Sequence, residues 1–372
     1  MKVWPFLAFV VSILLLANIH TAFAQVQATI TIMDYEGANP LFDAKLVIAD
    51  SASPEDKREF TADENGVVTI MGIDPGAEYL VEVYWNNPEY GDEEILVFQR
   101  EIQGGVLQAT SEIRVHVFNV EIIPLDKGGK PLLTPLDIAL KEPAATYLDG
   151  VKQVVEEEVF TARYILIPQG RHRLRIDWLG YTVYDGEVEI GLETLEGYIP
   201  GVDDPSQYNE TVQRTRKLWV ETSVADMEIT VTDPDGNPVS APVTIIDPEG
   251  FYQVEGEELS GIGLWVDYRE GGRVDWSQLP IVEYRVLVLS PFDLTEVLAE
   301  NTCVPAQPCK IVLDPNKGPY YTFKVRVVTE YGTPIEGVLV ELSGWGEPTD
   351  ANGTVVFTCV RPGTYTCLLY TS

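Results

Sequence analysis

Alternating apolar and polar residues predict most of the regular structure of this chain. Residues 26–32 alternate valine, alanine and isoleucine with glutamine and threonine, and the same period of two recurs at residues 228–232 and 323–327. A period of two is typical of strands with one buried and one solvated face. No helical period stands out after residue 25, and the valine-rich segment 151–161 is interpreted as a pair of strands. The pattern therefore predicts an all-β protein.

Turns that contain glycine and proline follow the alternating stretches at regular intervals. Their prolines recur about every 90 to 107 residues, a spacing that fits one β-sandwich per repeat. These prolines are Pro40, Pro131, Pro238 and Pro334. In the first and last copies an Asn-Gly pair, at residues 65–66 and 352–353, predicts a tight hairpin. Both central residues of such a turn need positive φ, which asparagine and glycine tolerate.

The last copy shows the order of elements most clearly. The Gly-x-Pro turn is followed by a strand at residues 338–342, the Asn-Gly turn, a strand at 355–357 and a Pro-Gly-Thr-Tyr signature at 362–365. This order resembles the carboxypeptidase regulatory-like (prealbumin-like, Cna-B-like) β-sandwich. The first copy matches with a longer insertion, and the second and third match at the turn and the closing strand. The resemblance implies a module that is not catalytic by itself and serves secreted or surface proteins as a spacer, stalk or binding unit.

The expected fold class is all-β, with tandem Ig-like or prealbumin-like antiparallel β-sandwich domains after an N-terminal signal peptide. The expected segments are a signal peptide at 1–24, sandwiches at 25–110, 111–222, 223–316 and a truncated one at 317–366, and a sequencing-adapter scar at 367–372. The second sandwich carries a long Gly/Pro/Asp-rich loop at 191–208, and the third carries an aromatic insertion at 256–278.

The first residues have the composition of an export signal. Lys2 precedes an apolar run at residues 3–17, and Ala22-Phe23-Ala24 forms a small-x-small cleavage site. The run is shorter than the roughly 20 residues that span a bilayer, which favours cleavage over a membrane anchor. We therefore expect a secreted, extracellular or cell-surface protein, with membrane contact only through this signal or another anchor segment.

The charge balance excludes one class of partner. The chain has 25 Lys and Arg residues against 58 Asp and Glu residues, giving a formal net charge of −33. Because such a chain repels phosphate, nucleic-acid binding is not expected as a main function. Hydrophobic residues make up 45% of the sequence, which excludes wholesale disorder.

Cysteine and histidine offer little catalytic chemistry. Cys303 and Cys309 enclose a short proline-containing loop, and we expect a disulfide between them in an exported chain; free thiols or a metal pair are the alternatives. Cys359 falls in the alternation of the last strands and is interpreted as a buried small hydrophobic residue. Neither a His-Glu-x-x-His nor a Gly-x-Ser-x-Gly motif occurs. We expect no enzymatic activity.

One acidic turn has the composition of a calcium loop. Asp233, Asp235 and Asn237 offer oxygen ligands at alternate positions, which suits Ca²⁺. Pro238 replaces the glycine that an EF-hand requires. The alternative is an ordinary strand-joining turn, since the same turn recurs without acidic residues in the last copy. No other cofactor is expected.

Aromatic residues gather in the third copy. Trp265, Tyr268 and Trp276 are candidates for stacking on sugars or for anchoring a protein partner. Two further aromatics, Tyr284 and Phe292, follow them. The alternative is that these rings cap the sandwich core. Asn209, in the predicted long loop, is a glycosylation sequon that has meaning only in a host that glycosylates.

Three functional hypotheses follow from the sequence. The leading one is a non-catalytic structural or adhesive protein, either a stalk or a component of an extracellular layer. The second is a module that binds glycans or other surface proteins through the aromatics of the third copy. The third is a set of accessory repeats from a secreted hydrolase whose catalytic domain lies outside this sequence.

Overall fold

A computed structural model describes residues 27–91, 93–133, 144–154, 160–196, 215–246, 262–266 and 272–370, with the backbone alone described at 262–266. The expected signal peptide, most of the loop 191–208 and much of the insertion 256–278 lie outside these residues. So do Tyr268 and Asn209.

Sandwich 1 combines a three-stranded sheet, in the order β4-β1-β7, with a four-stranded sheet, in the order β3-β2-β5-β6. Its elements are β1 (Ala28–Met33), β2 (Lys45–Asp50), β3 (Ser53–Thr61), β4 (Val67–Ile70), β5 (Glu78–Trp85), β6 (Ile95–Gln103), the helix α2 (Gly104–Ala109) and β7 (Glu112–Arg114).

Sandwich 2 repeats this plan with sheets β11-β8-β14 and β10-β9-β12-β13. Its strands are β8 (Val117–Leu125), β9 (Ala145–Leu148), β10 (Val151–Val154), β11 (Ala162–Pro168), β12 (Gly170–Trp178), β13 (Tyr181–Ile190) and β14 (Thr215–Glu221).

Sandwich 3 has sheets β18-β15-β21 and β17-β16-β19-β20. Its strands are β15 (Val224–Thr232), β16 (Ala241–Ile246), β17 (Ile262–Val266), β18 (Arg273–Pro280), β19 (Tyr284–Ser290), β20 (Asp293–Cys303) and β21 (Cys309–Val312).

Sandwich 4 follows a 3-10 turn, η3 (Pro315–Lys317), and its described sheets are β22-β25 and β24-β23-β26. Its strands are β22 (Tyr321–Arg326), β23 (Leu339–Leu342), β24 (Trp345–Pro348), β25 (Thr354–Val360) and β26 (Cys367–Tyr370). Residues 367–370, interpreted from the sequence as a scar, thus pair with β23 as an antiparallel strand.

In each of sandwiches 1, 2 and 3, the first strand lies between one antiparallel and one parallel partner. β1, β8 and β15 pair antiparallel with β4, β11 and β18, and parallel with β7, β14 and β21. The expected fold class of tandem antiparallel β-sandwiches is therefore confirmed, with one parallel pair in each of these units. The alternation explains the cores, because Ala28 and Ile30 on β1 are buried while Thr29 between them is exposed.

Two expectations need correction. The boundary between residues 110 and 111 is wrong, because β7 after Thr110 completes the first sheet by pairing with β1. The absence of helices is also wrong, since α2 spans six residues. Its apolar content is too short for a helical period to show: Leu107 is buried, whereas Val106 is 58% exposed. Among the described residues, no helix has the length and apolarity that a membrane crossing requires.

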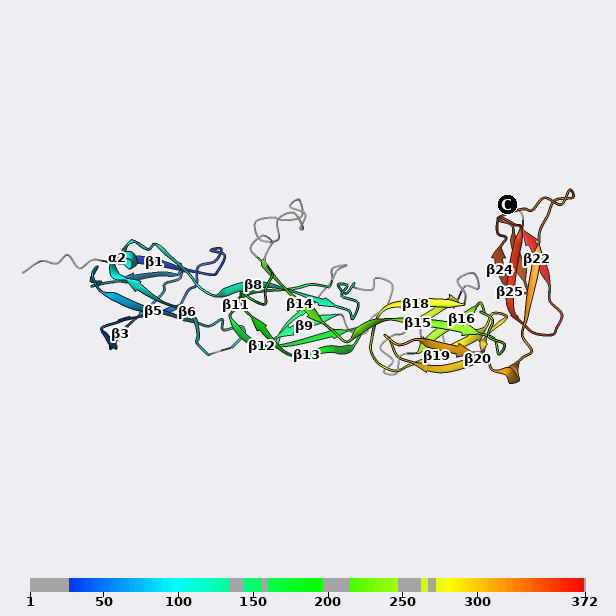
Figure 1. Cartoon of the computed structure of the whole chain (residues 1–372), viewed down its shortest axis with the longest axis horizontal. Helices are drawn as coiled ribbons and strands as arrows, with labels where there is room; N and C mark the ends of the chain where they lie inside the picture. The colour runs from blue at the N-terminus through cyan, green and yellow to red at the C-terminus, as the bar shows by residue number, and fades with distance from the viewer. Residues whose placement is uncertain are drawn as a thin grey trace, which may run out of the picture.

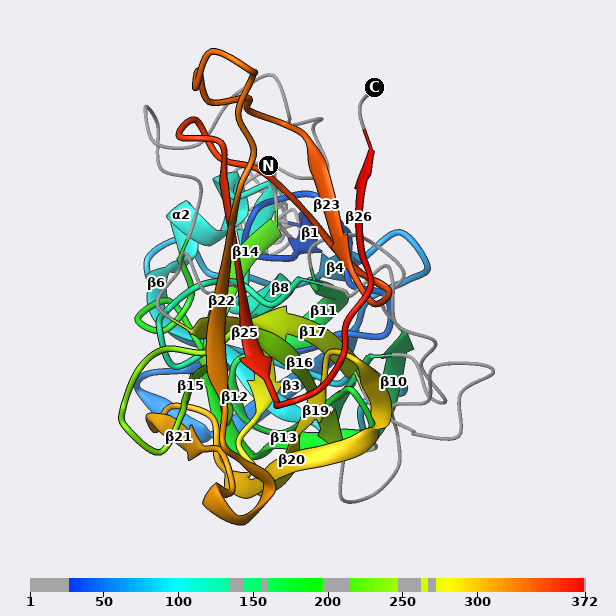
Figure 2. The same ribbon diagram turned by 90° about the vertical axis from the view of Figure 1, so that its right-hand side faces the viewer.

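The sandwiches follow one another along the chain. Sandwiches 1, 2 and 3 form a row with their strands running near the long axis, and the strands of sandwich 4 stand across that axis (Figure 1). Figure 2 looks along the row with sandwich 4 in front and the other strands behind it. The architecture is an extended one, in which neighbouring sandwiches meet at their ends.

Candidate functional site

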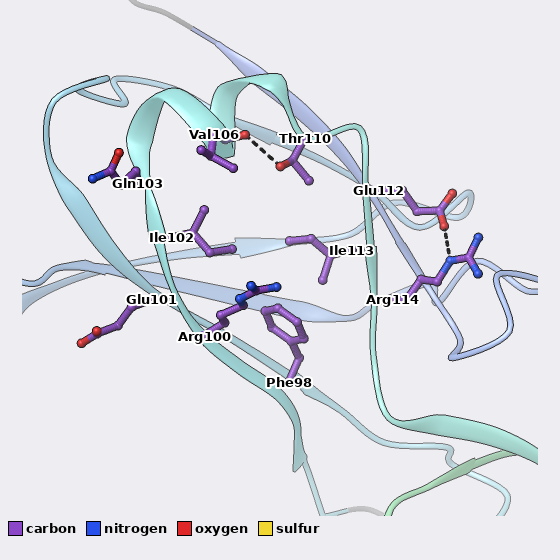
Figure 3. A pocket seen from close by; sticks show the side chains of 10 residues that line it. All are labelled: Phe98, Arg100, Glu101, Ile102, Gln103, Val106, Thr110, Glu112, Ile113 and Arg114. Carbon is purple, nitrogen blue, oxygen red and sulfur yellow. Dashed lines mark hydrogen bonds and ion pairs between the residues drawn. The ribbon is translucent and has the colours of Figure 1, made fainter. Parts of the chain in front are cut away.

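A surface groove of about 510 Å³ lies between β6, α2 and β7 of sandwich 1 (Figure 3). Phe98, Ile102 and Ile113 gather at its centre. At one side Arg114 Nε donates to Glu112 Oε1 at 2.6 Å, and this ion pair raises the pKa of the arginine. The lining contains no histidine, cysteine or serine. The groove therefore offers apolar contact area with an ion pair at one side.

The acidic turn of sandwich 3 uses its carboxylate internally. Asp233 Oδ1 accepts the backbone N–H of Asp235 at 3.0 Å and of Asn237 at 2.8 Å, and its Oδ2 accepts the Asn237 side-chain amide at 2.9 Å. Thr329 accepts the two corresponding backbone N–H groups in sandwich 4. These are the bonds of the strand-joining alternative. No cluster of three or more His, Cys, Asp or Glu residues suited to a metal occurs among the described residues, and Ca²⁺ binding stays a prediction without a supporting contact.

The cysteines occupy structural positions. Cys303 ends β20, Cys309 begins β21, and a disulfide joins them. Cys359 is 4% exposed, and burial raises the pKa of its thiol to about 12. A thiol with this pKa stays protonated at neutral pH and is a poor nucleophile.

The aromatic candidates divide between core and junction. Trp276 lies on β18, is 7% exposed and belongs to the core, so its proposed stacking on a ligand is wrong: the strand alternation turns its ring inward. Tyr284 is fully buried in the same core. Trp265 lies on β17 opposite Pro242, with only its backbone described. Phe292 packs against sandwich 4. Its proximity to the others in the sequence gave no indication of that contact.

Specific polar contacts also join the sandwiches where they meet. Between sandwiches 1 and 2, only Val115 and His116 separate β7 from β8. Tyr35 N–H of sandwich 1 donates to Val117 O at 2.9 Å. The Arg216 guanidinium of sandwich 2 lies 4.9 Å from the Tyr35 ring centroid, and its Nε donates to Glu36 Oε1 at 2.7 Å. A cation over an aromatic face with a paired carboxylate favours one relative orientation of the two units.

Between sandwiches 2 and 3, a single glutamine bonds to several groups of the neighbouring unit. Gln278 Oε1 accepts Leu133 N–H at 2.8 Å, and its Nε2 donates to Pro131 O at 2.8 Å. Trp178 Nε1 donates to Gln278 O at 3.1 Å. Gln278 is 8% exposed and Trp178 is 1% exposed. Buried polar groups that are fully paired in this way resist separation, since parting them in a dry interface leaves donors and acceptors unsatisfied.

The apolar packing is continuous across this junction. The buried side chains of sandwiches 2 and 3 form one cluster, which reaches from Phe118 to Leu313 in the sequence and also includes Cys359 of sandwich 4. The linker between β14 and β15 consists of Thr222 and Ser223, and Thr222 is 1% exposed. Lys127 N–H also donates to Val224 O at 2.8 Å across the two units. These two sandwiches are thus packed as one body.

Sandwich 4 meets sandwich 3 through side chains distant in the sequence. The Phe292 ring lies 5.0 Å from that of Tyr365 and 5.7 Å from that of Trp345. Thr358 Oγ1 accepts Ser240 N–H at 2.7 Å and donates to Ser240 O at 2.9 Å. None of these junction contacts was predicted from the sequence, because strand periodicity gives no information about contacts between the ends of repeats.

Comparison with known proteins gives only distant structural matches. No family model matches the chain, and no curated protein matches it. The Bacillus anthracis TIE protein is 16% identical with a TM-score of 0.21, and the match covers 78% of this chain and 49% of that one. This chain thus spans about half of that protein.

Two further structural matches are a pilin and part of a collagen binding protein. A streptococcal ancillary pilin is 12% identical with a TM-score of 0.22, covering 78% of this chain and 99% of that one. Two B repeat units of the Staphylococcus aureus collagen binding protein are 13% identical with a TM-score of 0.18, covering 94% of each chain. At these TM-scores the likeness carries no inference about function.

Proposed function

We propose that this protein is a non-catalytic spacer of the cell surface or extracellular space, a stalk that holds the groups at its two ends apart. The observation that carries the proposal is the burial of the junctions between sandwiches 1, 2 and 3. An extended row serves as a spacer only if its joints resist bending. The joint between sandwiches 2 and 3 contains paired polar groups and a shared apolar core, and Arg216 pairs with Tyr35 and Glu36 at the joint between sandwiches 1 and 2.

The acidic composition supports this role. A formal net charge of −33 keeps neighbouring copies soluble and apart at high surface density. The segment at residues 1–24 supplies the route out of the cytoplasm in this proposal.

The stalk is tested on a surface. The purified chain is attached through one end to a solid support at high density, and the thickness of the layer is measured by neutron reflectometry. We expect a thickness close to the length of the extended row in Figure 1. A collapsed layer of much smaller thickness contradicts the proposal. Protease treatment of intact source cells supplies the second arm, since a surface stalk is digested while cytoplasmic markers survive.

A role in binding glycans or surface proteins through the third copy has lost one of its three residues, since Trp276 is buried. The competing idea of accessory repeats in a hydrolase predicts the same rod, so the spacer function is common to both.

A further inference from the structure

The strand that pairs antiparallel with the first strand of the unit carries the same irregularity in three sandwiches. In sandwich 2 the register of β11 against β8 shifts between Tyr164 and Ile167. In sandwich 3 the register of β18 shifts between Trp276 and Leu279. In sandwich 4 the register of β25 shifts between Phe357 and Val360. Each shift is a β-bulge, with two residues of this strand facing one residue of the first strand.

The second residue of each bulge has a left-handed backbone. Leu166 has a φ of 54°, Gln278 of 55° and Cys359 of 57°. Left-handed φ is uncommon for residues other than glycine, asparagine and aspartate, and it persists only where surrounding contacts determine it. Three different side chains thus share one unfavourable conformation at one position of the repeat.

The same position in sandwich 1 is a glycine. Gly66, Gly272 and Gly353 each lie against the proline of the preceding turn in their own sandwich. Gly72 and Gln278 follow the first two of these glycines at the same spacing, as Cys359 follows Gly353. Gly72 has a φ of 67°, and a Cβ placed on it would meet only the Arg58 side chain, at 3.6 Å.

Each left-handed side chain contacts the preceding sandwich. Leu166 packs against the apolar core of sandwich 1. Gln278 exchanges two hydrogen bonds with residues 131–133 of sandwich 2. Cys359 lies in the core cluster of sandwiches 2 and 3, with its Sγ 3.9 Å from Ser240 O. Gly72, which lacks a side chain, makes no such contact.

The backbone carbonyls of the bulge follow the same division. In sandwich 2 they accept from Asn87 of sandwich 1, at 3.3 Å for Ile165 O and 3.2 Å for Leu166 O. In sandwich 3 Gln278 O accepts from Trp178 of sandwich 2. In sandwich 1 the donor comes from within, because Arg58 donates to Met71 O at 2.7 Å and to Gly72 O at 3.3 Å.

We propose that this left-handed bulge residue is the anchor residue through which each following sandwich binds the one before it. The bulge turns one side chain and its carbonyl out of the sheet at the pole that faces the preceding unit. The receiving surface differs from junction to junction: apolar for Leu166, and a neighbouring carbonyl and N–H for the Gln278 carboxamide. The inference deepens the proposed spacer function by naming the residues that make its joints.

The test uses the full chain with its disulfide and two substitutions of one residue. Gln278→Gly removes the side chain and relaxes the left-handed backbone. Gln278→Asn keeps a residue that tolerates left-handed φ but shortens the carboxamide arm by one methylene. Gln307→Asn, at an exposed glutamine of the disulfide loop, is the matched control. Hydrogen exchange measured by mass spectrometry follows the amide of Leu133, which Gln278 accepts, and the amides of β15 and β18.

We expect Leu133 to exchange about tenfold faster in both variants and unchanged in the control, with the sandwich 3 strands as protected as before. An exchange rate at Leu133 that stays within about twofold of the parent in both variants overturns the proposed role of Gln278. An equal rise in the exchange rates of the β15 and β18 amides also overturns the proposal, because it would show that Gln278 stabilises its own sandwich and not the junction. Neither result bears on the layer thickness measured for the parent chain, so the spacer proposal is tested separately.

Discussion

The junction between sandwiches 2 and 3 differs from the junction between sandwiches 3 and 4 in how the chain crosses it. At the first, Thr222 and Ser223 alone connect β14 to β15, and the last strand of one unit leads directly into the first strand of the next. At the second, residues 313–320 intervene, with η3 and two prolines among them. The short link keeps sandwich 3 in line, whereas the long one lets sandwich 4 turn across the row (Figure 1).

The two junctions also differ in the chemistry of their contacts. The first is sealed by a glutamine with paired backbone groups and by a shared apolar cluster. The second relies on Phe292 inserted beside Trp345 and Tyr365, and on the ion pair between Arg361 and Glu296, which is about one-third exposed. Linker length sets the direction of the next unit, and the buried contacts set how firmly it is held.

The largest effect is expected from Trp178→Ala. This side chain is 1% exposed and its Nε1–H reaches sandwich 3, so its removal should lower the free energy of unfolding by about 3–5 kcal/mol. Because the core is shared, calorimetry should show the transitions of sandwiches 2 and 3 falling together. Trp219→Ala, at a ring 39% exposed, is the control and should cost less than about 1 kcal/mol. A transition of sandwich 3 that does not move contradicts the coupling.

Phe292→Ala should weaken the second junction by about 1–3 kcal/mol, since it removes an aromatic ring packed against two others. The expected result is a lower unfolding temperature for sandwich 4, with sandwiches 1 and 2 unchanged. Tyr331→Ala, at a residue 87% exposed, should leave all transitions in place. If sandwich 4 unfolds as before without Phe292, the ring does not hold the junction.

Arg216→Lys should reduce the stability of the first junction by about 1 kcal/mol, because an ammonium group loses the planar stacking on Tyr35. Differential hydrogen exchange at Tyr35 and Val117 measures the change. Arg285→Lys, in an exposed pair with Glu300 on the face of sandwich 3, provides the comparison and should leave those amides unaffected.

The smallest effect concerns Cys359 and pH. Burial raises the pKa of this thiol from 9.0 to about 12, so in the folded chain it stays protonated where an unfolded thiol ionises. A raised pKa in the folded state favours folding fully below pH 9, and the contribution declines as the pH rises from 9 toward 12.

Thiol labelling at pH 8 and pH 10 measures this protection. Cys367 is exposed and should react at once, whereas Cys359 should react only as the second junction opens. Phe292→Ala should accelerate the labelling of Cys359. Equal rates for both cysteines in the parent chain contradict a closed junction.

The sequence predicted the units better than the joints. Apolar alternation at residues 26–32 and the recurring Gly-x-Pro turns predicted the sandwiches, because burial of alternate residues and the φ demands of turns are local properties. The Gly66 hairpin was predicted for the same reason. Calcium binding by Asp233 was one of two alternatives, because the same residue types serve as oxygen ligands of a metal and as hydrogen-bond acceptors in turns.

The junction chemistry has no local signal. Gln278 and Leu166 are different types of residue. They occupy the same position of the repeat only because of a bulge whose register is set by the partner strand. Trp276 belongs to the core because it occupies an inward-facing position of the alternation on β18. The other aromatic residues near it in the sequence gave no indication of that position. The boundary at residue 110 was misplaced because Thr110 and Ser111 have the composition of a linker while the next three residues complete a sheet.

Small-angle X-ray scattering of the parent chain at low and high salt tests the central claim most directly. Salt screens exposed charges but not buried contacts. If the junctions of sandwiches 1, 2 and 3 are held by buried groups, the scattering should show one rigid elongated particle with the same maximum dimension at about 0.05 M and 1 M salt. A profile of independent flexible units, or a maximum dimension that changes with salt, would contradict the account.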